Sequence, residues 1–305
     1  MASNNTNPLM KFSANVLFII FSLKNFNDLL AKILLSIGYI LSFRSLRKKL
    51  GLQRAEFAAS GAAPIAPEVL KFFMSIGVPL FEAYGMTENC AYATSNSPEN
   101  IKIGTVGVPA YGVELKLADD GEILIRSGGV FKGYFKDEQA TNETIDKDGW
   151  LYTGDVGIYD GDFVKIVDRK RDIIITSGGK NVSPSEIENK IKVSPFIKEA
   201  IVIGDRRKFL SVLIGIEFDT VSNWALRKNI PHTTYRDLSD KQEVKDLVWR
   251  EISKANEKTS SLEVREFRMI PKELDHEEGE LTATQKVKRN VLIEQFSDLI
   301  EEMYS

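Results

Sequence analysis

The chain has 305 residues, enough for about two domains of ordinary size. Hydrophobic residues make up 43% and charged residues 27%, and 40 basic against 43 acidic side chains leave a formal net charge of −3. This balance argues against intrinsic disorder and against a nucleic-acid partner. With only Cys90, His232 and His276, the chain has no intramolecular disulfide and no Cys/His zinc cluster. Any catalysis therefore uses Lys, Arg, Asp, Glu, Thr, Tyr or backbone groups, and the single cysteine suits a reducing compartment, the cytoplasm.

Two apolar runs, Val16–Leu23 and Leu29–Phe43, lie in a lead-in that spans residues 12–50. Neither reaches the roughly 20 uninterrupted apolar residues of a membrane-spanning helix. A signal peptide is also disfavoured, because Lys11 is the only basic residue ahead of the runs. We expect a buried helical hairpin here. The alternative is membrane association, with the basic residues of 44–49 on an anionic lipid surface.

From residue 51 onward, short strands and helices alternate with glycine-containing turns. Helical spacing of apolar residues predicts a helix over Glu68–Ile76, and a strand over Pro79–Glu82 runs into the next turn. Alternating apolar residues predict two β-hairpins, Val113–Ile125 and Tyr159–Val167, each of which turns at an Asp-Gly pair.

A charged stretch, Asp168–Asp172, follows these hairpins, and it is interpreted either as a solvated loop or as an interdomain hinge. Ser183–Glu186 has the residues of a helix start, with a capping Ser, a Pro at the first helical position and a Glu three residues after the cap. Periodicity then predicts two strands and two helices, at Ala200–Gly204, Leu210–Phe218, Lys241–Lys258 and Val291–Met303. The last third of the chain is thus expected to be a small α+β unit.

Several short segments carry the chemistry of a ligand site. Ser60–Pro64 is a loop of small residues that lets a ligand approach the backbone. Tyr84–Glu88 offers an aromatic ring, a hydroxyl and a carboxylate, which suit a base, a phosphate and Mg²⁺. Tyr152–Asp155 places a carboxylate in a tight turn, where it suits the hydroxyls of a ribose. Ser177–Lys180 lacks the residues of a phosphate-binding loop, and Lys286 is expected on an exposed loop. Each segment also has a purely structural interpretation, as an ordinary turn or surface residue.

Taken in chain order, six segments resemble the AMP-forming acyl-CoA synthetases, a family of adenylate-forming enzymes. The segments are SGAAP, EAYGMTEN, GEILIRSGGVFKGYFKD, DGWLYTGD, VDRKRDIIITSGGKNVSPSEIE and GELTATQKVKR. Two further stretches resemble the long-chain fatty-acid branch of the family, FLSVLIGIEFDTVSNWALRKNI and FSDLIEEMYS. The resemblance implies an α/β fold in which the trailing part of a large AMP-binding domain, 1–168, is joined by a hinge to a mobile α+β domain, 169–305.

The resemblance implies a two-step reaction with ATP, Mg²⁺ and CoA. The carboxylate of a long-chain fatty acid attacks the α-phosphate of ATP to give acyl-AMP and pyrophosphate, and the CoA thiol then displaces AMP. The residues that the resemblance assigns to ATP or AMP are Gly61, Ala62, Ala83, Tyr84, Gly85, Met86, Thr87, Asp155, Arg169 and Lys286.

The same resemblance gives individual residues their roles. Tyr84 would stack on adenine, Thr87 would contact phosphate as a catalytic residue, and Glu88 would be a catalytic residue that ligates Mg²⁺. Asp155 and Arg169 would hold the ribose hydroxyls.

In the C-terminal part, Lys286 would be the mobile catalytic lysine, a compact cation that stabilises charge developing on the α-phosphate. Asp168 would be the hinge about which the C-terminal domain turns between the two half-reactions. Gly178 and Gly179 would line the path of CoA.

The chain also departs from the family pattern, because the family's Ser/Thr/Gly-rich phosphate loop ending in Pro-Lys-Gly does not occur in it. We therefore expect a long-chain fatty acid–CoA ligase whose partners include a missing N-terminal half. Two alternatives stay open. One is a truncated, non-catalytic fragment or isoform that binds nucleotide or a partner, and the other is a related ligase for an aryl or medium-chain acid.

Overall fold

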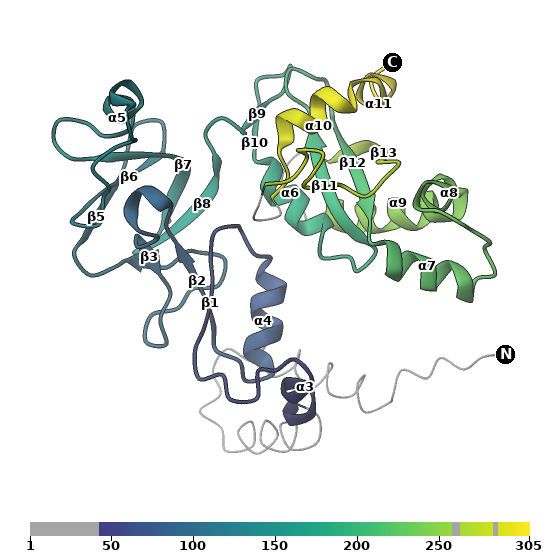
Figure 1. Cartoon of the computed structure of the whole chain (residues 1–305), viewed down its shortest axis with the longest axis horizontal. Coiled ribbons are helices and arrows are strands. Elements are labelled where there is room, and N and C mark those ends of the chain that lie inside the picture. The colour runs from purple at the N-terminus through teal and green to yellow at the C-terminus, as the bar shows by residue number, and fades with distance from the viewer. Residues whose placement is uncertain (1–42, 258–262, 283–285) are drawn as a thin grey trace. The chain divides into compact units, whose positions relative to one another are not determined.

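The fold is given by a computed structural model that describes residues 43–257, 263–282 and 286–305 (Figure 1). The chain divides into two compact units. The first contains the described residues up to Lys116, with Leu124–Tyr152 and Tyr159–Lys165, and the second contains Leu117–Ile123, Thr153–Ile158 and Ile166–Ser305.

The two apolar runs expected to form a helical hairpin lie, apart from Phe43, outside the described residues. The described part begins with the short helix α3 (Arg44–Lys49), and Phe43 packs in a small buried cluster with Ile76 and Val78. No helix in the part of the chain that the structure describes is both long enough and apolar enough to cross a membrane.

The first unit contains a four-stranded sheet in the order β1-β2-β3-β4. Its strands are β1 (Ala58–Ser60), β2 (Leu80–Tyr84), β3 (Thr94–Ser95) and β4 (Val108–Pro109). Helix α4 (Pro67–Ser75) connects β1 to β2 and confirms the predicted helix, with proline at its first position. Strands β1 and β2 are parallel, and Ser60 lies opposite Glu82. Because neighbouring parallel strands end at the same edge of a sheet, the loops that follow β1 and β2 leave it side by side.

A second four-stranded sheet has the order β5-β6-β7-β8. Its strands are β5 (Val113–Leu117), β6 (Glu122–Ser127), β7 (Leu151–Asp160) and β8 (Phe163–Arg169), with the short helix α5 (Glu138–Thr144) between β6 and β7. Both predicted hairpins are confirmed. Their turns contain Gly121 and Gly161, whose φ angles of +83° and +67° favour glycine.

One sequence expectation about this sheet is wrong, and another holds only in part. Tyr152–Asp155 lies within strand β7, not in a tight turn, since Thr153 and Asp155 alternate with exposed neighbours as buried residues of a strand. Gly154 keeps a positive φ of +70° inside that strand. The charged stretch is not simply a solvated loop either, because Asp168 is a buried residue of strand β8.

The second unit holds a three-stranded sheet in the order β11-β12-β13. Its strands are β11 (Ile197–Ile203), β12 (Leu210–Ile216) and β13 (Val264–Met269), and every residue of β12 is buried. Strand β11 is antiparallel to β12, whereas β13 is parallel to it. The predicted strands near residues 200 and 210 are therefore confirmed. A two-stranded ribbon, β9 (Ile174–Ile175) and β10 (Asn181–Val182), precedes this sheet in the chain.

Helices cover both faces of this sheet (Figure 1). Side chains alternate along β11, so Val202 packs in one buried cluster and Ile201 in another. The first cluster takes in helices α6 (Pro184–Ile191), α7 (Phe218–Arg227), α8 (Tyr235–Asp240) and α9 (Gln242–Glu257). The second takes in α10 (Arg289–Gln295) and α11 (Ser297–Glu302). Burial on both faces explains why the central strand is apolar apart from Ser211.

Among these helices, α6 begins as predicted, and Glu186 N donates to the capping Ser183 Oγ at 3.3 Å. Helix α9 confirms the predicted helix, with its apolar face buried. The predicted closing helix Val291–Met303 is wrong as a single element. It is divided into α10 and α11 at Phe296, where φ is −106° and ψ is 25°, and the chain turns there while the Phe296 ring stays in the buried cluster.

Candidate functional site

The loop after β1 lies against strand β2. A Cβ added at Gly61 would stand 3.1 Å from Ala83 O, so only a residue without a side chain fits there comfortably. Ala62 follows with a φ of +68°, a left-handed conformation that is uncommon outside glycine. The structure therefore brings Gly61 and Ala83, two of the predicted nucleotide-binding residues, into contact at the edge where β1 and β2 end.

The chain after β2 turns sharply between Tyr84 and Ala91. A Cβ at Gly85 would lie 2.3 Å from Ala91 C, so glycine is required by the close approach of the backbone. Met86 N donates to Asn89 Oδ1 at 2.9 Å, which starts the short 3-10 helix η2 (Thr87–Asn89). Tyr84 is buried and Thr87 is exposed. The hydroxyl predicted to contact phosphate thus reaches solvent, whereas the stacking role of Tyr84 stays a prediction.

Glu88 accepts a hydrogen bond from Tyr134, a residue that is not among the predicted site residues. Tyr134 Oη lies 2.9 Å from Glu88 Oε1, and Phe131 N donates to Glu88 O at 2.7 Å. Burial and the hydrogen bond to Glu88 raise the pKa of Tyr134. Among the described residues no three His, Cys, Asp or Glu side chains gather as a metal site. A single carboxylate fits Mg²⁺ that takes its other ligands from phosphates and water.

Asp155 and Arg169 meet across the neighbouring strands β7 and β8. Arg169 Nε lies 3.4 Å from Asp155 Oδ1, with the arginine side chain about half exposed and the aspartate side chain 10% exposed. Both residues were expected to hold a ribose, and the sheet places them together. Their ligand stays a prediction.

Glu122, which is not among the predicted site residues, fixes the segment that carries Asp155. Its carboxylate is buried and accepts from Gly154 N and from Lys170 Nζ, each at 2.9 Å. Lys170 also lies 2.6 Å from Asp120 Oδ2. In the sequence, Glu122 stands next to acidic residues at a hairpin turn. Such residues usually lie exposed to solvent, so the pattern did not indicate a buried, hydrogen-bonded carboxylate.

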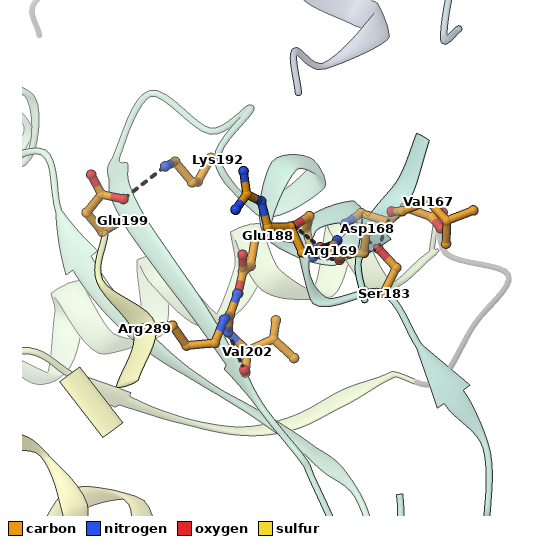
Figure 2. Close-up of polar contacts among 11 residues, drawn as sticks. Val167, Asp168, Arg169, Ser183, Glu188, Lys192, Glu199, Val202 and Arg289 are labelled. Atoms are coloured by element: carbon orange, nitrogen blue, oxygen red, sulfur yellow. Dashed lines mark hydrogen bonds and ion pairs between the residues drawn. The ribbon is translucent and has the colours of Figure 1, made fainter. Parts of the chain in front are cut away.

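Asp168 is held by four hydrogen bonds, three of them from the start of α6 (Figure 2). Ser183 Oγ lies 2.7 Å from Oδ2, and Ser185 N lies 3.0 Å from the same oxygen. Ser185 Oγ and Arg169 N donate to Oδ1 at 2.9 and 2.8 Å. These bonds explain the burial of Asp168, since a buried carboxylate needs several donors. Its role as a hinge stays a prediction.

Gly178 and Gly179 lie in an exposed turn between β9 and β10. A Cβ at either glycine would meet no atom within 4 Å, and Gly179 has a φ of +75°. Glycine at 179 is therefore explained by the turn itself, and an involvement of the pair with CoA stays a prediction.

Lys286 lies on a short antiparallel hairpin that ends where α10 begins. Leu281 and Val287 form a β-bridge, Thr282 N donates to Lys286 O at 2.8 Å, and Lys288 N donates to Glu280 O at 2.8 Å. Lys286 is exposed, as expected.

Two family models match the chain, "AMP-binding enzyme" over residues 26–135 and "AMP-binding enzyme C-terminal domain" over residues 171–305. The chain belongs to the AMP-binding enzyme family. Curated relatives of the chain are named long-chain-fatty-acid–CoA ligases, which confirms the resemblance to the AMP-forming acyl-CoA synthetases.

Two of these relatives illustrate the likeness. The long-chain-fatty-acid–CoA ligase FadD15 of Mycobacterium tuberculosis (strain ATCC 25618 / H37Rv) is 38% identical over 268 residues, which cover 87% of this chain and 44% of that protein. The long-chain-fatty-acid–CoA ligase ACSBG2 of Gallus gallus is 32% identical over 290 residues, which cover 87% of this chain and 38% of that protein. The chain thus spans less than half the length of these curated relatives.

Solved structures share the fold. The A domain of carboxylic acid reductase from Segniliparus rugosus, in complex with AMP and a co-purified carboxylic acid, matches with a TM-score of 0.68 at 22% identity. The match covers 97% of this chain and 45% of that one. The anthranilate CoA ligase AuaEII, in complex with anthranoyl-AMP, gives 0.62 at 22% identity, over 85% of this chain and 48% of that one. The expected α/β fold of an adenylate-forming enzyme is confirmed.

Proposed function

We propose that this chain provides the ATP-binding residues and the mobile lysine of a long-chain fatty acid–CoA ligase. The observation that carries the proposal is the parallel pair β1 and β2, whose loops Gly61–Ala62 and Tyr84–Glu88 leave one edge of the sheet. Ligands of open α/β sheets bind outside the carboxyl ends of strands. The 38% identity to a long-chain-fatty-acid–CoA ligase supports the choice of reaction and acid.

In the first half-reaction, a carboxylate oxygen of the fatty acid forms a bond to the α-phosphorus of ATP, and pyrophosphate leaves. Lys286 would place its ammonium against the α-phosphate oxygens, where negative charge accumulates in the transition state. Thr87 would donate its exposed hydroxyl to a phosphate oxygen. Mg²⁺ held by Glu88 would neutralise phosphate charge when bound.

In the second half-reaction, the CoA sulfur attacks the acyl carbon of acyl-AMP, and AMP leaves. Asp155 would accept hydrogen bonds from the two ribose hydroxyls, and Arg169, which lies against it, would keep the carboxylate oriented. Asp168 would be the point about which the second unit turns between the half-reactions.

ATP–pyrophosphate exchange by the purified chain tests the proposal, with palmitate, octanoate and benzoate supplied in parallel. With the missing N-terminal half supplied as a complementing polypeptide, we expect exchange that is fastest with palmitate and is lost in Lys286→Ala. Faster exchange with octanoate or benzoate would favour the related ligase for a medium-chain or aryl acid. No exchange with any acid would overturn catalysis by this chain and leave the non-catalytic, nucleotide-binding interpretation.

A further inference from the structure

Arg289 is the first residue of α10 and follows Lys286 by three positions. Its guanidinium contacts Glu188 and Val202 (Figure 2). Nη2 lies 2.6 Å from Glu188 Oε1, and Nη1 donates to Val202 O at 2.9 Å. The two side chains are 20% and 14% exposed, so the pair is largely removed from water. A planar guanidinium that binds two partners in this way fixes the orientation of the arginine side chain as well as its distance from them.

Glu188 and Arg289 together bind the backbone of Val202 at one edge of the three-stranded sheet. Strand β11 is an edge strand, and Val202 N donates to Glu188 Oε1 at 2.8 Å while Val202 O accepts from Arg289. Both backbone groups of Val202 are thereby satisfied without a further strand. Because α6 packs on one face of the sheet and α10 on the other, the ion pair joins the two layers around this edge.

The same helix α6 is tied to the proposed hinge. Ser185 binds Asp168 through its amide and its hydroxyl, and Glu188 follows Ser185 by three residues, one helical turn away. Helix α6 therefore carries the anchor of Asp168 at its start and the anchor of Arg289 one turn later.

The hairpin that carries Lys286 is also held at its other end. Glu280 is completely buried, accepts from Asp275 N at 2.8 Å and lies 2.9 Å from Lys272 Nζ. One end of the hairpin is thus fixed through Glu280 and the other through Arg289. Lysine has a flexible four-carbon side chain, so the position of its ammonium depends on how well its backbone is held.

We propose that Glu188 and Arg289 are positioning residues that hold the Lys286 backbone for the adenylation step. The inference rests on the proposed function only for the role of Lys286. A displacement of about 1 Å at a reacting group can cost about a hundredfold in rate, so loosening the start of α10 affects the step that uses the lysine. A pair that merely stabilised the fold would affect both half-reactions equally.

The first test does not require activity. Hydrogen exchange of residues 280–282 and 286–288 is compared in the full chain and in Arg289→Gln, Glu188→Gln and Arg289→Lys. The control is Lys192→Gln, which removes an ion pair of 2.9 Å to Glu199 between the end of α6 and the same strand (Figure 2).

We expect exchange of residues 280–282 and 286–288 to become at least tenfold faster in Arg289→Gln and Glu188→Gln, less so in Arg289→Lys, and to stay unchanged in the control. Near-ultraviolet circular dichroism confirms that each variant is folded. If Arg289→Gln or Glu188→Gln does not fold, the comparison is made with Arg289→Lys, which keeps the positive charge. Unchanged protection of residues 280–282 and 286–288 in the folded variants would overturn the proposal.

The second test separates the half-reactions. We expect Arg289→Gln to lower kcat for ATP–pyrophosphate exchange at least tenfold, with KM for ATP within threefold. Thioester formation from supplied palmitoyl-AMP should stay within threefold, and Arg289→Lys should recover part of the exchange rate. Equal losses in both half-reactions would overturn the positioning role. If the unaltered chain catalyses neither half-reaction, the proposed function fails, and the hydrogen-exchange result alone decides the inference.

Discussion

Ser185 binds Asp168 twice, through its hydroxyl at 2.9 Å from Oδ1 and through its amide at 3.0 Å from Oδ2. The carboxylate of the proposed hinge is therefore attached to the first turn of α6. As a consequence, a rotation at the hinge that keeps these bonds intact takes place in the backbone at or before Asp168, and α6 moves with its side chain.

This attachment predicts a stability effect of Asp168→Asn. An amide offers one acceptor oxygen in place of two, so the donor groups of Ser183 or Ser185 lose a partner in a buried place. We expect the free energy of unfolding to fall by about 1 to 3 kcal/mol, measured by urea denaturation. Asp172→Asn is the matched control in the same charged stretch, where the side chain makes only a long contact of 3.9 Å with Arg171. Equal losses of stability in the two variants would contradict the conclusion that hydrogen bonds from Ser183 and Ser185 to Asp168 stabilise the fold.

A pH effect is expected from Glu82, which is buried in strand β2 opposite Ser60. Burial raises the pKa of Glu82 from 4.5 to about 7, partly offset by a hydrogen bond with the backbone of Ile65. The folded state keeps a proton that the unfolded chain releases, so this group contributes stability below pH 4.5 that is lost as pH rises to about 7. The loss is on the order of 2 to 3 kcal/mol.

Glu82→Gln removes this titration while keeping the shape and the acceptor oxygen. We expect the melting temperature of the variant to depend less on pH between 4.5 and 7 than that of the unaltered chain, and to be higher at pH 8. The exposed Glu56→Gln serves as control. A pH profile for Glu82→Gln that parallels that of the unaltered chain would refute the expectation.

The turn after β2 predicts that Gly85 cannot carry a side chain. Its added Cβ would overlap the backbone of Ala91 at 2.3 Å, which no rotamer relieves. We expect Gly85→Ala to reduce the free energy of unfolding by about 2 to 4 kcal/mol. Gly128→Ala is the control, since a Cβ there meets nothing within 4 Å. Urea denaturation of both variants gives the comparison, and a loss at Gly85 no larger than that at Gly128 would show that the turn relaxes.

The carboxylate of Glu88 is expected to carry the dependence of ATP binding on Mg²⁺. Glu88→Gln should weaken ATP binding at least tenfold in the presence of Mg²⁺ and leave binding in the presence of a chelator almost unchanged. Tyr134→Phe removes only the hydrogen bond of 2.9 Å and should change the affinity less than threefold. Calorimetric titration with and without Mg²⁺ measures both, and the same loss in Glu88→Gln under the two conditions would exclude a role in metal binding.

Local signals in the sequence predicted local structure well. The helix after Pro67, the cap at Ser183 and both Asp-Gly hairpins depend on residues within a few positions of one another, so periodicity and turn chemistry were sufficient. The α/β architecture and the list of candidate residues depended on the family resemblance.

Long-range relationships were not predictable in the same way. Gly154 indicates a turn in the sequence, yet the neighbouring strands of the sheet keep it within β7. Glu188 and Arg289 are 101 residues apart, and each looks like an ordinary charged residue of a helix surface. Only the packing of α6 and α10 around the edge of β11 brings them together.

The most direct measurement of the central claim is the binding of palmitoyl sulfamoyl adenosine, an unreactive mimic of palmitoyl-AMP, to the purified chain by calorimetry. The account predicts saturable binding that is weakened at least tenfold in Asp155→Ala, because a charged acceptor of two hydroxyl groups is lost. Asp160→Ala, at the other end of the same strand, should bind as the unaltered chain does. No saturable binding, or equal binding by the Asp155 and Asp160 variants, would contradict the claim that this chain holds the adenylate.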